Sequence, residues 1–322
     1  MNRFFKIIPK PVYLYVLTLV FTTFWTITPN LLSASPMAIS LEGRWDITVD
    51  MNGKPAPSWL EVRHSGNRTL VGQFVSVSGS ARPISEVHVK DNTFHFAIPP
   101  QWESGTGDFS VKGTFQGDKI SGSLTTPDGK TYSWTGVRAP SLRRTSPPVW
   151  GKPIKLTQGN SLTGWHAEGT NQWVIKDGVL KSEKSGANLI TDQKFNDFKL
   201  HVEFRIPKGS NSGVYLRGRY EVQVTDGKGM EPSPGELGGV YGFISPSEMM
   251  AKEPGEWQSF DVTLIGRMIT LAVNGKTVIT NQEIPGITGG ALDSNEGEPG
   301  PLYIQGDHGP VEYRNIVITP AN

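Results

Sequence analysis

The 322-residue sequence contains no cysteine. This absence excludes disulfide bonds, thiolate-bound zinc or iron–sulfur sites, a cysteine nucleophile and lipidation at a cysteine. Packing of side chains, rather than covalent cross-links, must therefore hold the fold together.

The sequence also lacks an excess of charge of either sign. It has 31 Lys and Arg residues against 30 Asp and Glu residues, which leaves a formal net charge of +1. Such a balance gives no overall attraction to nucleic acid or to an anionic membrane surface. We therefore expect no nucleic-acid partner, and we expect no nucleotide cofactor.

Long stretches suited to helices are scarce, because glycine and proline are abundant. The 37 glycines and 24 prolines make up about a fifth of the residues, against about 12% in ordinary proteins. Both residues interrupt helix interiors. The composition therefore argues against a mainly helical protein, and the length allows roughly two domains.

The one long hydrophobic run lies at the amino terminus. Arg3, Lys6 and Lys10 precede an uncharged stretch over Val12–Ile27, and small residues follow up to Ala38. This order is typical of a secretory signal peptide over residues 1–38. It predicts export to the periplasm or the extracellular space. The alternative is an uncleaved membrane anchor, for which the run is short.

Beyond residue 38 the pattern changes to short alternating segments separated by turn residues. Residues 39–138 contain eight such segments, with Asn52-Gly53 and Asp128-Gly129 among the turns between them. This spacing predicts a small antiparallel barrel or sandwich with an accessory role. Residues 139–153 are rich in proline and serine and are predicted to form a linker. The strand segments predicted before the linker are Gly43–Val49, Trp59–Arg63, Leu70–Val77, Ile84–Lys90, Thr93–Ile98, Phe109–Phe115, Lys119–Leu124 and Thr131–Val137.

Residues 154–322 again alternate between apolar and polar positions. Asp177-Gly178 and Asn274-Gly275 are strong signals for two-residue hairpins. About eleven strands with almost no helical period predict two packed sheets in a jelly-roll-like β-sandwich.

In several of these strands the polar residues share one parity. Apolar residues occupy the even positions of Phe198–Ile206, and the same alternation recurs in the strands that follow. Since successive side chains of a strand point to opposite faces, the polar set is predicted to share one functional sheet face. Loop carboxylates Glu253, Glu256, Glu296 and Glu298 are predicted to be solvated instead. The predicted face consists of Glu203, Arg205, Tyr215, Arg217, Glu221, Gln223 and Gln305.

Several ordered blocks between Ile154 and Pro320 resemble the 3-keto-disaccharide hydrolase domain family. The resemblance covers nearly all of the second predicted domain and leaves residues 39–138 outside it. It implies a concanavalin-like sandwich with an active site on its concave sheet. The blocks that carry it are Phe195–Arg205, Asn211–Arg217, Tyr220–Val224 with Asp226, Gly239–Gly242, Pro254–Trp257, Val273–Gly275, Gln305–Gly309 and Tyr313–Ile316.

The resemblance also implies a substrate, a glycoside already oxidised at C3 of the sugar. A C3 ketone acidifies the C2 proton, so a base can remove it, the C1 substituent can leave, and water can then add. Such a reaction requires a base, stabilisation of an enediolate and help for the leaving oxygen. One divalent metal ion of unknown identity would serve the second need.

Residues of this sequence can be matched to those needs. Glu221 and His308 are the candidates for the base and for its acid partner or metal ligand, with the assignment between them left open. Glu203 and Arg217 complete the predicted catalytic set. The predicted substrate-binding residues are Arg205, Tyr215, Gln223, Tyr241, Gln305 and Asp307.

Two other functions stay open at this point. A non-catalytic carbohydrate-binding protein would use the same polar and aromatic face. An ordinary glycoside hydrolase would need two carboxylates across the scissile bond, and Glu203 with Glu221 is the conceivable pair.

Overall fold

The computed structural model describes residues 40–322, and every regular element in this range is a β-strand. The prediction of an all-β protein is confirmed. The predicted signal peptide or anchor lies outside the described residues. Within residues 40–322 no helix is long and apolar enough to cross a membrane.

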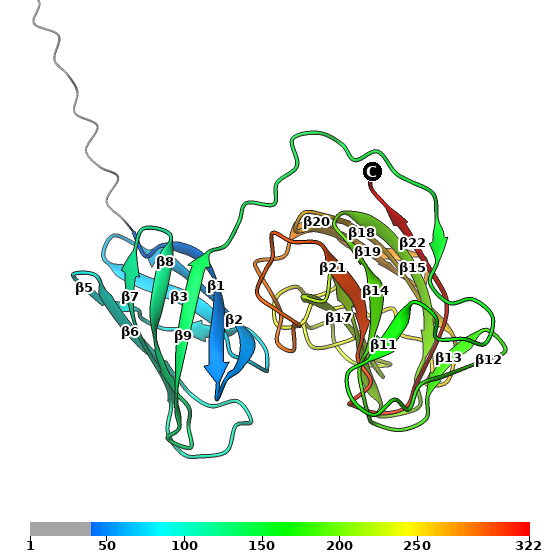
Figure 1. Ribbon diagram of the computed structural model, residues 1–322, viewed down its shortest axis with the longest axis horizontal. Coiled ribbons are helices and arrows are strands. Elements are labelled where there is room, and N and C mark those ends of the chain that lie inside the picture. The colour runs from blue at the N-terminus through cyan, green and yellow to red at the C-terminus, as the bar shows by residue number, and fades with distance from the viewer. Residues whose placement is uncertain (1–39) are drawn as a thin grey trace, which may run out of the picture. The chain divides into compact units, whose positions relative to one another are not determined.

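The first nine strands form a single antiparallel sheet in which β1 pairs with β9 as well as with β2. Its buried face has a core of its own, which includes Trp45, Phe74, Phe96 and Trp134. Figure 1 shows the strong twist of these blue to green strands. The strands are β1 (Gly43–Met51), β2 (Lys54–Ser65), β3 (Thr69–Val75), β4 (Arg82–Ile84), β5 (His88–Lys90), β6 (Thr93–Ile98), β7 (Phe109–Gln116), β8 (Lys119–Thr125) and β9 (Thr131–Arg138).

One predicted strand of this sheet, Ile84–Lys90, is divided in the structure. Its first part lies in β4, which pairs with β3, and its last part is β5, which pairs with β6 at the other end of the strand order. The residues between them connect the two edges, and Val87 is buried and donates its N–H to Leu70 O at 2.7 Å. The segment predicted as one strand therefore contributes residues to both edge strands of the sheet.

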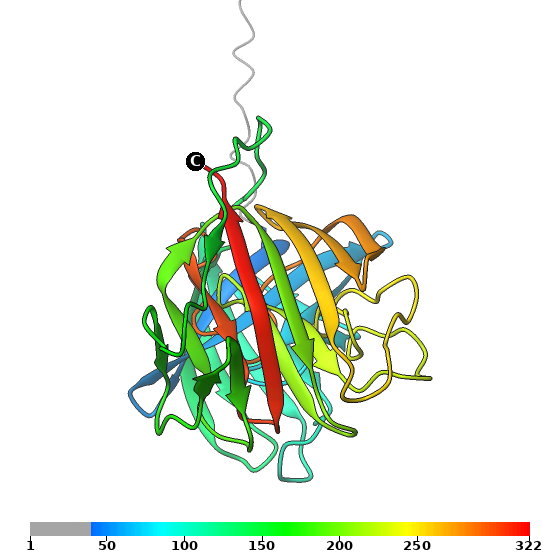
Figure 2. The same cartoon turned by 90° about the vertical axis from the view of Figure 1, so that its right-hand side faces the viewer.

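The remaining strands form two sheets that pack face to face. The buried positions of both sheets, among them Val202, Phe204, Val214, Val222 and Ile304, form one core. One sheet has the order β12-β13-β22-β15-β18-β19-β20 with β10 beside β22, and the other has the order β11-β14-β21-β16-β17. Figure 2 faces the first of them, with β22 in red. The strands of this eight-stranded sheet are β10 (Ile154–Lys155), β12 (Val174–Lys176), β13 (Val179–Ser182), β15 (Phe198–Arg205), β18 (Gln258–Ile265), β19 (Met268–Val273), β20 (Lys276–Glu283) and β22 (Val311–Pro320). Those of the five-stranded sheet are β11 (Trp165–Ala167), β14 (Leu189–Phe195), β16 (Asn211–Leu216), β17 (Tyr220–Thr225) and β21 (Gly300–Ile304).

Within residues 40–322 the nine-stranded sheet packs against this sandwich in one compact unit. Trp59 of β2 is fully buried in the sandwich core, with its ring edge-on to Phe243 at 5.4 Å. Gly286 makes room for that indole, because a Cβ there would lie 2.1 Å from Trp59 Nε1. The residues after β9 are also attached to the sandwich, since Arg144 holds the Asp197 carboxylate through two hydrogen bonds of 2.6 and 3.0 Å.

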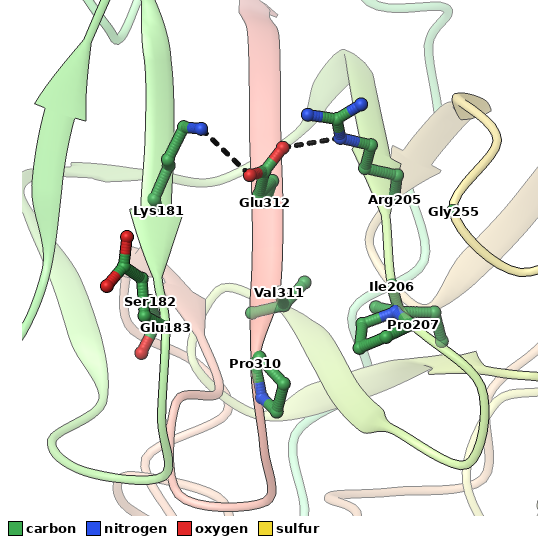
Figure 3. Close-up of a pocket in the computed structure, with 10 residues that line it drawn as sticks. All are labelled: Lys181, Ser182, Glu183, Arg205, Ile206, Pro207, Gly255, Pro310, Val311 and Glu312. Carbon is green, nitrogen blue, oxygen red and sulfur yellow. Dashed lines mark hydrogen bonds and ion pairs between the residues drawn. The ribbon is translucent and has the colours of Figure 1, made fainter.

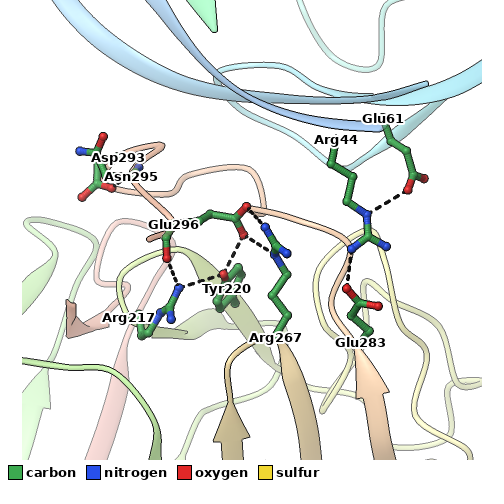
Figure 4. A network of polar contacts seen from close by, with 9 residues as sticks. All are labelled: Arg44, Glu61, Arg217, Tyr220, Arg267, Glu283, Asp293, Asn295 and Glu296. Carbon is green, nitrogen blue, oxygen red and sulfur yellow. Dashed lines mark hydrogen bonds and ion pairs between the residues drawn. The ribbon is translucent and has the colours of Figure 1, made fainter. Parts of the chain in front are cut away.

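A buried polar network surrounds Glu296, which has no solvent exposure. Its carboxylate accepts two hydrogen bonds from Arg267, at 3.0 and 2.7 Å, and one from the Tyr220 hydroxyl at 2.7 Å (Figure 4). The prediction that Glu296 is a solvated loop acid is therefore wrong. The sequence could not indicate the partners of Glu296, because Arg267 and Tyr220 are 29 and 76 residues away along the chain.

Candidate active site

A cavity of about 300 Å³ opens on the face of the five-stranded sheet that points away from the sandwich core. Such a volume lies at the lower end of the range for small-molecule sites. Residues from β16, β17 and β21, from the loops around them and from the nine-stranded sheet region contribute to it. Its lining consists of Ser78, Gly79, Trp102, Asn211, Tyr215, Glu221, Gln223, Gly235, Tyr241, Gly289, Gly290, Tyr303, Gln305, Asp307 and His308.

Strand register places the main groups of the cavity in one row. Tyr303 of β21 lies opposite Tyr215 of β16, and Tyr215 lies opposite Glu221 of β17. Directly opposite residues share a face, so these three side chains project together, while Val214 and Val222 project into the core. The two tyrosine rings stack at 4.3 Å between centroids, with 16° between their planes.

Glu221 forms the buried end of this row and is 2% exposed. Burial raises the pKa of its carboxyl to about 8, although the Tyr215 hydroxyl and His308 act in the opposite direction. Gly213 leaves space for the carboxylate, since a Cβ there would lie 2.2 Å from Glu221 Oε1. The site therefore contains a carboxyl group that changes protonation near neutral pH.

The Tyr215 hydroxyl lies 2.9 Å from Glu221 Oε2 and 2.9 Å from Gly289 O. A hydroxyl has only one proton to donate. When Glu221 is protonated, its own O–H can donate to the tyrosine oxygen and the tyrosine proton can go to Gly289. When Glu221 is ionised, the tyrosine proton can turn to the carboxylate.

His308 and Asp307 lie on the loop after β21 and form a hydrogen-bonded pair through His308 Nδ1. The Asp307 carboxylate raises the pKa of the half-exposed His308 imidazole. The loop packs closely against Ala187, because a Cβ at Gly306 would lie 2.3 Å from the Ala187 carbonyl oxygen. Because β21 ends at Ile304, strand alternation no longer governs this segment, and Gln305, Asp307 and His308 all reach the cavity.

Two buried acceptor atoms in the lining, Asn211 Oδ1 and Gln305 Oε1, have no hydrogen-bond partner among residues 40–322. Buried polar atoms are nearly always paired in native proteins, so these two suit donors brought by a ligand. Sugar hydroxyls are such donors. Tyr241 is also half-buried in the lining, and burial beside Glu221 raises its pKa to about 12.

The structure brings together most of the predicted site residues. Sequence reasoning missed Asn211, Tyr303 and the contribution of Trp102. Tyr303 could have been found, because it has the same strand parity as Gln305, whereas nothing in the sequence connects Trp102 with this sheet. The predicted residues that line the cavity are Tyr215, Glu221, Gln223, Tyr241, Gln305, Asp307 and His308.

Glu203 and Arg205 do not share this face, so that part of the prediction is wrong. They lie on β15, which belongs to the eight-stranded sheet, and they project from its side away from the core. Glu203 binds Arg314 and Asn315. Arg205 pairs with Glu312, as Figure 3 shows, with Lys181 on the other side of that carboxylate.

The cavity in Figure 3, about 390 Å³, is separate from the candidate site and has no residue in common with it. Its central charged groups are engaged with one another, because Glu312 pairs with both Lys181 and Arg205. We therefore assign these groups to the stability of the outer sheet face.

Arg217 also lies away from the cavity. It follows β16 in the tight turn before β17, with a positive φ of 53°, and its side chain is buried. Its guanidinium donates to the Tyr220 hydroxyl at 3.1 Å and to the Glu296 backbone carbonyl (Figure 4). The turn reverses the chain, so the alternation expected from β16 does not extend to Arg217.

The residues present do not form a ready metal site. Among residues 40–322 no three His, Asp or Glu side chains are grouped in a way that could hold an ion. Glu221 and His308, the predicted ligands, are each engaged with a neighbour, Tyr215 and Asp307 respectively. The metal ion stays a prediction, and no step below depends on it.

The fold and the cavity define a β-sandwich protein with a polar site on the outer face of its five-stranded sheet. The chain belongs to the 3-keto-alpha-glucoside-1,2-lyase-like domain family, whose model matches residues 152–319, more than half of the chain. Residues 43–138, with the nine-stranded sheet, lie outside the match.

Individual relatives cover the chain only in part. A 3-keto-disaccharide hydrolase of Bacteroides thetaiotaomicron is 32% identical over a 75-residue alignment, which covers 19% of this chain and 26% of that protein. The matched segment thus spans about a quarter of the curated relative. A crystal structure of a candidate glycosyl hydrolase from Parabacteroides distasonis is 28% identical, with a TM-score of 0.44, over 55% of this chain and 92% of that one. A carbohydrate-binding module from Bacillus subtilis is 13% identical, with a TM-score of 0.32, over 48% of this chain and 93% of that one.

Proposed function

We propose that this protein is an exported enzyme that cleaves 3-keto-glycosides by elimination followed by addition of water. The observation that carries the proposal is the buried Glu221 carboxyl in one cavity with the His308–Asp307 pair and two unpartnered acceptor oxygens. Membership of the 3-keto-alpha-glucoside-1,2-lyase-like family supports the substrate class.

We assign the base to Glu221. A carboxylate with a pKa near 8 is a much stronger base than an ordinary glutamate, and its pKa lies close to the pH at which an enzyme works. In the first step Glu221 removes the C2 proton, and the C–H electron pair moves toward the C3 carbonyl to form an enediolate. Burial makes the ionised form of Glu221 unfavourable, and this free-energy cost is removed when the carboxylate takes up the C2 proton.

We assign the acid to His308. The Asp307 carboxylate favours the imidazolium form, and the half-exposed ring lies in the same lining as Glu221. In the second step the enediolate re-forms the C3 carbonyl, the C1–O bond breaks, and His308 protonates the leaving oxygen. Water then adds to C1 of the resulting enone while a proton returns to C2, so the net reaction is hydrolysis.

The amide groups of the cavity bind the sugar in this scheme. Gln305 and Asn211 offer acceptor oxygens to sugar hydroxyls, and their N–H groups can donate to the C3 oxygen as negative charge develops there. The stacked Tyr215 and Tyr303 rings form one side of the site and fix the Tyr215 hydroxyl beside Glu221.

The alternative of an ordinary glycoside hydrolase required Glu203 and Glu221 to act as a pair. These two residues lie on the outer faces of different sheets and cannot flank one scissile bond. A simple binding protein would show ligand binding without turnover.

The proposal is tested by Glu221→Gln, with Glu203→Gln as the matched control on the other sheet. Gln keeps the size of the side chain but cannot take up a proton. We expect kcat on a 3-keto-glycoside to fall by about 10²–10⁴, the usual contribution of a general base, with unchanged folding. The control should stay within about twofold, since Glu203 does not line the cavity and its surface ion pair contributes at most about 1 kcal/mol to stability. Full activity in Glu221→Gln would refute the assignment. Turnover with and without a chelator tests the metal ion separately.

A further inference from the structure

Trp102 is the only exposed tryptophan among residues 40–322, with 56% of its surface accessible. It lies on the loop between β6 and β7 of the nine-stranded sheet and lines the candidate active site together with Ser78 and Gly79. A large exposed aromatic at a polar cavity is a typical ligand contact. The proposed chemistry above does not use it.

The loop holds Trp102 in place before any ligand binds. The Glu103 carboxylate accepts the backbone N–H groups of Gln101 and Trp102 at 2.7 and 3.2 Å, and Arg82 pairs with that carboxylate at 3.2 Å. Gln101 in turn donates to the Ser80 hydroxyl at 2.9 Å. A ligand that contacts Trp102 therefore pays little for ordering this loop.

The neighbouring loop brings Trp102 close to the reactive groups. The indole lies against Gly79, where a Cβ would come within 2.7 Å of Cζ2. The Gly79 carbonyl oxygen packs on Gly289, where a Cβ would be 2.0 Å away, and the Gly289 carbonyl accepts the Tyr215 hydroxyl. Trp102 is thus connected through two glycine contacts to the Tyr215–Glu221 pair.

We propose that Trp102 forms a subsite for the leaving group of the substrate, which would be a ring with a flat apolar face. This inference rests on the proposed function. Glu221 is buried, so the reacting sugar occupies the inner part of the cavity, and its C1 substituent extends toward the exposed rim where the indole lies. Both the hydroxyl-poor face of a second sugar and the face of an aryl group are flat and apolar, so either can pack on an indole.

The nine-stranded sheet then has a direct role in substrate choice, although the family match covers residues 152–319 only. Substrates with a ring as leaving group gain a contact that methyl glycosides lack. Burial of one face of an aromatic ring corresponds to about tenfold in affinity.

The test compares Trp102→Ala and Trp102→Phe in the full chain, with Trp150→Ala as the matched control. Trp150 is half-buried beside Lys199 and does not line the cavity. kcat/KM is measured for three 3-keto-glucosides whose leaving groups are a sugar, a phenol and methanol. We expect Trp102→Ala to lose about tenfold on the ring-bearing substrates and less than twofold on the methyl glycoside. Trp102→Phe should keep most of the activity, and Trp150→Ala should match the parent.

Of the two ring-bearing substrates, the one whose kcat/KM falls more in Trp102→Ala identifies the preferred leaving group, a sugar or an aryl group. Equal losses on all three substrates, or no loss on any, would overturn the subsite. Failure of the proposed function looks different, because the parent protein would then cleave none of the three. In that case calorimetric binding of the unoxidised disaccharide and methyl glycoside decides: the subsite stands if Trp102→Ala weakens only the disaccharide and is overturned otherwise.

Discussion

Glu221 derives its chemical character from its neighbours. Gly213 leaves room for the carboxyl, Tyr215 supplies a hydroxyl, and burial disfavours the charged form. The same glutamate on a solvated strand would be ionised at neutral pH and would be a weak base. The residue type was visible in the sequence, whereas its altered pKa depends on residues that only the fold brings together.

The pH profile of turnover should reflect this environment. A base must be deprotonated to act, and burial raises the pKa of Glu221 to about 8, so kcat/KM should rise with pH up to about 8. Tyr215→Phe removes the hydroxyl that favours the carboxylate, so we expect the rising limb to move to higher pH. Tyr132→Phe, in the nine-stranded sheet, serves as the control. A limb that stays in place or moves to lower pH would contradict the assignment of Glu221 as the base.

At the scale of elements, the sequence was sufficient for the strands but not for their sheets. Alternation and turn residues located β6 and the hairpins at Asp177-Gly178 and Asn274-Gly275. Alternation shows that a strand has two faces, but it does not show which sheet the strand joins. Glu203 on β15 and Glu221 on β17 therefore looked alike, although hydrogen bonding places them in different sheets.

The loop before β21 shows the same limit for buried charge. Glu296 and Glu298 are two residues apart and look equally polar, yet Glu296 is fully buried against Arg267 and Tyr220 while Glu298 is exposed. We expect Glu296→Ala to lower the free energy of unfolding by about 3–5 kcal/mol, because it leaves Arg267 buried and unpaired. Glu298→Ala should change it by less than about 0.5 kcal/mol. Urea unfolding of both variants measures the difference, and equal stability would contradict the assigned network.

At the scale of the whole molecule, the nine-stranded sheet and the sandwich share buried groups. Asp46 of β1 is 4% exposed, and its carboxyl group interacts with the Glu296 carboxylate of the sandwich. Burial and the neighbouring Glu296 charge raise the pKa of Asp46 to about 9. Together with Trp59 in the sandwich core, this pair makes the first sheet an integral part of the body that carries the site.

The protonated carboxyl group of Asp46 makes the free energy of unfolding depend on pH. The pKa of Asp46 is raised from 3.8 to about 9, so the folded state holds a proton that the unfolded chain releases. The contribution of Asp46 is fully present below about pH 4 and is lost as the pH rises through about 9. Asp46→Asn keeps a hydrogen-bond donor but does not titrate, so the variant should gain stability relative to the parent between pH 5 and 9. Urea unfolding across that range tests this, and a difference that does not change with pH would contradict it.

The central claim is that this protein breaks a glycosidic bond through removal of the C2 proton next to a C3 ketone. The most direct measurement incubates the full chain in heavy water with a 3-keto-disaccharide and, separately, with the unoxidised disaccharide, followed by NMR of the products. We predict cleavage of the oxidised substrate alone, with deuterium at C2 of the released 3-keto sugar. Equal cleavage of both substrates, or cleavage without deuterium at C2, would contradict the mechanism.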